Sequence, residues 1–353
     1  MMKAKRGALL AAALASSCLG LNVQTRAKPA MADADATAQK QAAEAESGQK
    51  KFGLPIACRL GEDCYIMHYV DVDPSPAEHD FACGRQTYDQ HDGTDFAIAN
   101  EKAMAAGVAV IAAAAGTVSR ARDGMADRRV EGEAAKQAVG KVECGNGLVV
   151  DHGQGWESQY CHLKQGSVRV KPGEVVAKGA VLGMVGESGL AGFPHVHLTL
   201  RHLGKPVDPF VGPAMPPGCG GPRRPVWEAP LAYVPTGLVQ AGFATQTPTL
   251  GEVLAGTYRE TVFPVGSPAL IFWVHDFGVL QGDIESFQMT SPGGETVIKQ
   301  EQALKNAQRA WLSFAGKRNS PEKPLAAGVW QARYRLKRGD EVIVDIHREA
   351  NLQ

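Results

Sequence analysis

Two histidines separated by one residue lie in a short apolar segment. Residues 194–200 read PHVHLTL, with the alternation of polar and apolar residues that is typical of a β-strand. Because alternate residues of a strand point to the same face, we expect His195 and His197 on one face and Val196 and Leu198 in the core. Two imidazoles on one face are half of a zinc site. Taken alone, this motif could also be a pair of surface histidines that have no function.

Two further segments contain the residue types that would complete such a site. HDGTD (91–95) places His91 and Asp95 four positions apart, with a glycine between them at an expected turn into a strand. YCHL (160–163) places His162 at the end of an expected strand. Zn²⁺ binds imidazole nitrogen and carboxylate oxygen at about 2.0–2.2 Å. Each segment alone is typical of a protein surface, but the ordered set H-x3-D, H and H-x-H predicts a metal site.

Six segments between residues 81 and 210 occur in the order and with the spacing of a known family. They are HDGTD (91–95), GNGLVVDHG (145–153), YCHL (160–163), VKPGEVVAKGAVLGMVGESG (170–189), PHVHL (194–198) and VDPF (207–210). Over about a third of its length the chain thus resembles the M23 zinc metallopeptidases of the lysostaphin and LytM type, which are peptidoglycan endopeptidases.

The resemblance implies a site and a reaction. It implies that His91, Asp95 and His197 bind one Zn²⁺ per chain and that His162 and His195 are catalytic residues beside the metal. Three protein ligands leave a fourth zinc position for water, as in catalytic zinc sites. The implied reaction is the hydrolysis, by metal-activated water, of peptide bonds in the stem or cross-link peptides of bacterial peptidoglycan.

The chain departs from the family pattern in three ways. It is rich in cysteine, it has an inserted polar stretch at residues 121–143, and Cys161 stands in YCHL where alanine is usual. We expect the stretch 121–143 to form a surface loop or a short helix. By reshaping the peptide groove, it would alter which peptides are cleaved.

Two other functions have to be weighed against the peptidase. Exported relatives that lack metal ligands act as catalytically inactive cell-wall binding or amidase-activating proteins, but all five polar positions are present here. The segment VKPGEVVAKGAVLGMVG (170–186) also resembles a lipoyl or biotinyl carrier domain. Such a carrier needs a lysine at its hairpin tip, and residues 183–186 (GMVG) offer none.

Composition narrows the class of protein further. The chain has 353 residues, enough for two domains, with 44% hydrophobic and 21% charged residues. Its 37 basic and 37 acidic side chains balance, so the basic excess of a dedicated nucleic-acid binder is missing and we expect no nucleic-acid partner. The 40 glycines and 21 prolines favour many turns and short strands.

The N-terminal segment has the layout of a secretory signal. Lys3, Lys5 and Arg6 precede an apolar run that is too short for a transmembrane helix, and no later run is long enough. We therefore expect a signal peptide at residues 1–27, export to the periplasm or the extracellular space, and no transmembrane segment. In an alternative interpretation, Cys18 is the lipid anchor of a lipoprotein.

Six cysteines remain after Cys18 is set aside. An even number in an exported chain indicates up to three disulfides, although 15 pairings are possible. Cys58 and Cys64 could close a small local loop, and Cys144 and Cys161 flank an expected hairpin. Pairing of Cys83 with Cys219 would follow by elimination.

The expected fold is all-β, with two domains behind a flexible leader at residues 28–51. The first, at 52–215, is a compact antiparallel β-sheet peptidase domain of the lysostaphin/LytM type, similar to a lipoyl-type barrel-sandwich. A proline-rich joint at 211–230 precedes a small β-sandwich at 226–353, whose role the sequence does not indicate. Three tryptophans in it are expected in the core rather than on a sugar-binding surface: Trp273, Trp311 and Trp330.

Overall fold

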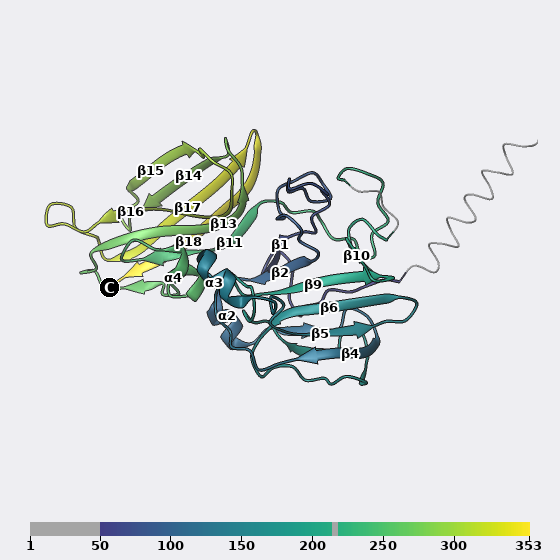
Figure 1. The fold of residues 1–353 in the computed structure, drawn as a ribbon. Helices are drawn as coiled ribbons and strands as arrows, with labels where there is room; N and C mark the ends of the chain where they lie inside the picture. Colours follow the sequence, from purple (N-terminus) through teal and green to yellow (C-terminus); the bar gives the residue numbers. More distant parts are fainter. Residues whose placement is uncertain (1–49, 214–217) are drawn as a thin grey trace, which may run out of the picture. The chain divides into compact units, whose positions relative to one another are not determined.

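A computed structural model describes residues 50–213 and 218–353 of the chain. The expected signal peptide, the alternative anchor at Cys18 and all but the last two residues of the expected leader lie outside the described residues. Strands dominate the described part, as Figure 1 shows. In this part of the chain, no helix is both long and apolar enough to span a bilayer.

The first region is built on an eight-stranded sheet in which every pair of strands is antiparallel. A two-stranded sheet and two short helices accompany it. In spatial order the strands of the large sheet are β1 (Cys64–His68), β2 (Thr94–Ile98), β9 (His195–His202), β6 (Trp156–Leu163), β5 (Asn146–Asp151), β4 (Gly116–Arg122) and β7 (Val175–Val176), with β10 (Lys205–Val207) paired to β9. The small sheet is β3 (Ala109–Ile111) with β8 (Val181–Met184), and the helices are α2 (Glu101–Ala106) and α3 (Gly132–Val139).

The large sheet buries one face against the core. On β9 the side chains of Val196, Leu198 and Leu200 are at most 1% exposed and join a cluster that extends from Phe52 to Trp227. The alternation predicted for this strand is therefore confirmed, and its other face is left to carry His195 and His197. The antiparallel β fold expected for this region is confirmed as well.

The second region consists of two further sheets and a helix. A three-stranded sheet has the order β11 (Gly237–Ala244), β13 (Ala269–Val279), β16 (Gln308–Arg318). A five-stranded sheet has the order β12 (Val262–Phe263), β18 (Glu341–Leu352), β17 (Gly328–Arg338), β14 (Ile284–Thr290), β15 (Thr296–Ala303), and α4 (Leu250–Ala255) follows β11. All pairs are antiparallel except the short parallel contact between β12 and β18.

One buried cluster joins these two sheets, as expected for a sandwich. Leu270 and Phe272 from the three-stranded sheet pack with Trp330 and Tyr334 from the five-stranded sheet. On β17 alternate side chains from Trp330 to Leu336 are at most 2% exposed, as the alternation in the sequence predicts. Trp273 and Trp330 are 2% and 1% exposed, so neither presents a surface for binding sugars.

Three disulfides fasten loops to the first region, and they pair the cysteines as expected. They join Cys58 to Cys64, Cys83 to Cys219, and Cys144 to Cys161. The inserted stretch 121–143 contains the end of β4 and helix α3, which agrees with the expected short helix.

Candidate metal and catalytic site

Adjacent strands bring the sequence-predicted site residues together. In the register of β2 and β9, Asp95 lies opposite His197 and Ala97 opposite His195, and β6 lies on the other side of β9 (Figure 1). On β6, Cys161 is opposite His197, which places His162 at the same end of the sheet. His91 comes from the turn before β2. All five predicted site residues are buried, with exposed fractions of 9% or less.

The turn that presents His91 depends on a glycine. A Cβ atom on Gly93 would lie 2.4 Å from Nε2 of His197 and 2.8 Å from the carbonyl oxygen of Leu198. A side chain at this position would therefore push the turn away from β9. The glycine in HDGTD lets the loop approach the strand closely enough for the two histidines to meet.

Three ligand atoms converge at one point. His91 Nε2 lies 3.2 Å from Asp95 Oδ1 and 3.1 Å from His197 Nδ1, and His197 Nδ1 lies 2.9 Å from Asp95 Oδ1. Ligands of a tetrahedral zinc ion at about 2.0–2.2 Å stand about 3.3–3.6 Å apart, close to this spacing. The donor set and its spacing therefore fit a divalent metal ion such as zinc.

The two histidines of this group are oriented by contacts on their far sides. Nδ1 of His91 lies 2.6 Å from the carbonyl oxygen of Tyr69, which can only accept a hydrogen bond. Nε2 of His197 lies 2.9 Å from Thr199 Oγ1 and 3.2 Å from Asp92 Oδ1. A proton on each far nitrogen leaves a lone pair on the nitrogen that faces the common point. Both rings are thus oriented with one nitrogen toward the common point, where it can bind a metal once it carries no proton.

Asp95 is oriented by His68, a histidine to which the sequence assigned no role. The β1–β2 register pairs the two residues, and His68 Nδ1 lies 2.9 Å from Asp95 Oδ2, which leaves Oδ1 for the metal group. Burial acts to raise the pKa of Asp95, but the surrounding histidines outweigh it and hold that pKa well below its usual range. Asp95 is therefore ionised, as a metal ligand has to be.

The charge of His197 depends on two carboxylates, those of Asp92 and Asp95. Burial acts to lower its pKa, but the contacts with Asp92 and Asp95 outweigh burial and raise the pKa to about 9. Near pH 7 the metal-free His197 ring therefore carries a proton on each nitrogen, and a bound cation would displace the proton on Nδ1.

His162 and His195 form a pair beside the metal group. Their ring centroids are 4.6 Å apart, and His195 Nε2 lies 3.6 Å from Asp95 Oδ1. Nδ1 of His162 faces the carbonyl oxygen of Ser188 at 2.8 Å, and Nδ1 of His195 faces that of Phe193 at 2.8 Å. Each ring therefore carries its proton on Nδ1 and presents the lone pair of Nε2.

Both of these rings are electrically neutral near pH 7. Burial, reinforced by the neighbouring histidines, holds the pKa of His162 well below its usual range, and burial lowers the pKa of His195 to about 4. His162 also has a φ of 61°, in the left-handed region that residues other than glycine rarely adopt. Such backbone strain is found where the surrounding structure fixes a functional side chain.

Tyr88 covers one side of the site, and no motif in the sequence indicated it. Its ring stacks on His91 with 4.3 Å between centroids and meets His68 edge-on at 5.3 Å. Tyr88 is 42% exposed whereas His91 is 2% exposed, so the tyrosine ring shields this histidine from solvent on one side.

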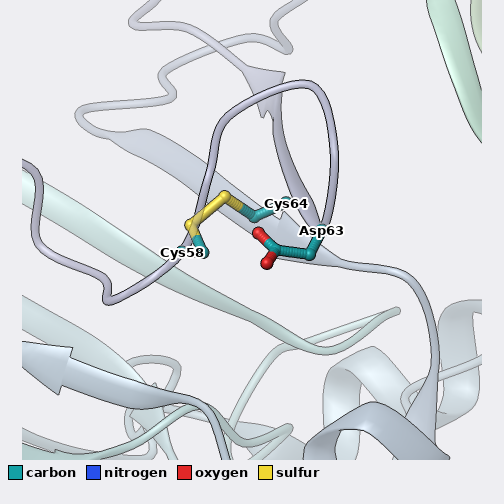
Figure 2. Close-up of side chains that lie close together, drawn as sticks. All are labelled: Cys58, Asp63 and Cys64. Atoms are coloured by element: carbon teal, nitrogen blue, oxygen red, sulfur yellow. A yellow bond between two sulfur atoms is a disulfide. The ribbon is translucent and has the colours of Figure 1, made fainter.

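A second group of potential ligands, Cys58, Asp63 and Cys64, does not form a metal site. Figure 2 shows the two cysteines joined by a disulfide, so neither offers a thiolate. Asp63 Oδ1 instead accepts a hydrogen bond from the backbone N–H of Arg59 at 2.6 Å. The aspartate therefore closes the small loop.

The site has one buried aspartate and two histidines around one point, and two neutral histidines lie beside them. This arrangement is typical of a metallopeptidase site. Residues 89–209 match the model of peptidase family M23. Over about a third of its length the chain is therefore similar to the M23 peptidases, and the His91, Asp95 and His197 group lies within the matched segment.

Curated proteins with similar sequences match over short segments. Peptidoglycan DD-endopeptidase ShyA of Vibrio cholerae is 36% identical over 64 residues, which cover 18% of this chain and 14% of that protein. An uncharacterized metalloprotease of Haemophilus influenzae is 30% identical over 120 residues, which cover 34% of this chain and 20% of that protein. Cell division protein DipM of Caulobacter vibrioides is 38% identical over 71 residues, which cover 18% of this chain and 11% of that protein. The chain thus spans no more than a fifth of the length of these relatives.

Two solved structures illustrate the structural matches. A zinc-containing peptidase from Vibrio cholerae is 22% identical, with 45% of this chain and 39% of that chain covered and a TM-score of 0.31. The catalytic domain of lysostaphin from Staphylococcus simulans is 20% identical, with 40% of this chain and 85% of that chain covered and a TM-score of 0.27.

Proposed function

We propose that this protein is a zinc-dependent endopeptidase that hydrolyses peptide bonds in bacterial cell-wall peptidoglycan. The observation that carries the proposal is the convergence of His91, Asp95 and His197 on one point, with His162 and His195 beside it. The match of residues 89–209 to the M23 peptidases supports the reaction class. The similarity to a peptidoglycan DD-endopeptidase supports the substrate.

In this proposal His91 Nε2, Asp95 Oδ1 and His197 Nδ1 would hold one Zn²⁺ per chain. When bound, the zinc ion polarises the scissile carbonyl group and makes water a stronger acid. His68 and Thr199 keep two of the ligands in place through the contacts described above. Since the three ligands come from one loop and two paired strands, the sheet itself fixes their geometry.

His162 and His195 would move protons. Each has its Nδ1 proton committed to a backbone carbonyl oxygen, so Nε2 can accept a proton from water and return it to the leaving amine. Once protonated, either ring would also stabilise negative charge on the tetrahedral oxygen. Both are thus proposed as catalytic residues.

We also propose that the protein acts outside the cytoplasm, in the periplasm or the extracellular space. Three disulfides persist only in an oxidising compartment. Peptidoglycan lies in the same compartment.

The test is mass analysis of the fragments that the full chain releases from purified peptidoglycan, with and without a chelator. We expect peptide cleavage that the chelator abolishes and added zinc restores. His197→Ala should lose both bound zinc and fragment release, whereas His347→Ala, at an exposed position of β18, should retain both.

Two results would contradict the proposal. One is fragment release by His197→Ala at the rate of the parent chain. The other is binding to peptidoglycan with no chelator-sensitive cleavage of any wall type, which would favour a catalytically inactive wall-binding or amidase-activating protein.

A further inference from the structure

A recess of about 300 Å³ opens beside the proposed catalytic site. Its lining includes Arg120 and Arg122 on β4, Lys141 after α3, and Gln159 on β6. The disulfide of Cys144 also borders it. Three of these residues carry a positive charge.

The strand registers connect this recess to the metal group. Arg120 pairs with Val149, Val149 with Gln159, and Gln159 with Thr199, so the four residues form one row across β4, β5, β6 and β9. Paired residues of neighbouring strands point to the same face of a sheet. Thr199 Oγ1 lies 2.9 Å from His197 Nε2, so the row ends at the metal group. Neighbouring strands are about 4.8 Å apart, which puts the backbone of Arg120 about 14 Å from that of Thr199.

The positive charges of the recess are not neutralised by the protein. Within residues 50–213 and 218–353, Arg120, Arg122 and Lys141 form no ion pair, and only Arg122 is tied down, by a 2.7 Å hydrogen bond from Nε to the carbonyl oxygen of Gly145. Arg201 on the same face differs, because its guanidinium lies 3.1 Å from Asp92. The recess therefore has a net positive charge that is free to bind an anion.

The recess borders both ends of the inserted stretch of this chain. Arg122 stands near the beginning of residues 121–143 and Lys141 near the end, so the two stems of the insertion carry two of the three charges. The disulfide of Cys144 with Cys161 ties the end of the insertion to β6, next to His162. The charged stems thus have a fixed position relative to the proposed catalytic histidines.

We propose that this recess binds a free carboxylate of the substrate peptide, three to four residues from the bond that is cut. The inference rests on the proposed peptidase function and adds a determinant of specificity to it. An extended peptide advances about 3.3 Å per residue, so three to four residues cover most of the distance from Thr199 to Arg120. The planar guanidinium of arginine matches the two oxygens of a carboxylate.

The test compares two forms of one cross-linked wall peptide: the free acid, and the same peptide with its carboxylates converted to amides. The variants are Arg120→Gln/Lys141→Gln and the control Lys205→Gln/Lys171→Gln, which removes two exposed charges that do not line the recess. Arg122 is left in place because it holds Gly145. The measured quantity is the ratio of kcat/KM for the acid to kcat/KM for the amide.

We expect the parent chain and the control to prefer the acid by about tenfold, as for a hydrogen-bonded charge pair that is open to solvent. In Arg120→Gln/Lys141→Gln the ratio should fall to about twofold or less. A parent chain that cleaves both forms equally well would overturn the inference, and so would a double variant that retains the parent's ratio. If the parent chain cleaves neither form, the proposed function itself fails, which is a different result.

Discussion

At the scale of single residues, the most informative contact is the one between His68 and Asp95. It fixes which carboxylate oxygen faces the proposed metal, so we expect His68→Ala to weaken zinc binding by about 10- to 100-fold, the usual effect of losing a residue that orients a ligand. Competition with a chromophoric chelator would measure the affinity. His347→Ala serves as the control, and an unchanged zinc affinity in His68→Ala would show that Asp95 needs no such support.

A second prediction concerns Asp276, which lies in the core of the sandwich region. This side chain is 0% exposed. Its Oδ2 accepts a 2.6 Å hydrogen bond from the Tyr334 hydroxyl, and its Oδ1 has no hydrogen-bond partner among the described residues. Burial, reinforced by the charge of Glu285, raises the pKa of Asp276 to about 7. Since the unfolded value is about 3.9, the folded chain binds more protons between about pH 4 and 7 and loses stability as the pH rises through that window.

Asp276→Asn removes this buried charge and keeps an acceptor for Tyr334. We expect its Tm to equal that of the parent near pH 4 and to exceed it at pH 8, with a gain in unfolding free energy of roughly 4 kcal/mol at most. Calorimetry from pH 4 to 8 would measure it, with Asp340→Asn at an exposed turn as the control. A difference that does not change with pH would contradict the shifted pKa.

At the scale of elements, the sequence predicts what is local to one strand. The alternation in residues 194–200 and in 330–336 shows which side chains are buried, because it depends only on the period of a strand. The pairing of His68 with Asp95 depends instead on the register between β1 and β2, which contains an irregularity between Ile66 and His68. No pattern within a single segment shows that register. The same is true of Arg120, whose position relative to the site depends on three strand pairings.

The disulfides allow a prediction about how loops contribute to stability. Cys144–Cys161 closes a separation of 17 residues, and Cys83–Cys219 closes one of 136. Because closing a longer loop removes more entropy from the unfolded chain, replacing both cysteines by serine should cost about 3 kcal/mol for the first pair and about 5 kcal/mol for the second. Urea unfolding of the two double variants would test this. Equal losses would show that native-state packing around the sulfurs matters more than loop length.

At the scale of the whole molecule, the described residues form two large buried clusters that share no residue. One contains residues 52–227 and surrounds the sheet that carries the histidines, and the other contains residues 243–352. A small third cluster connects the two regions, with Tyr65 stacked on Phe277 at 5.2 Å between ring centroids. The three residues that would bind the proposed metal all lie in the first region.

If residues 52–215 and 226–353 form two domains, as we propose, zinc should stabilise only the first. Calorimetry of the metal-free chain should show two transitions, and zinc at about 100 times its Kd should stabilise the peptidase transition by about 2.7 kcal/mol without moving the other. His197→Ala should show no such shift. A single transition that moves as a whole with zinc would mean that the contact around Tyr65 and Phe277 is strong enough to couple the two cores, so that the binding of metal and of substrate would be felt throughout the molecule.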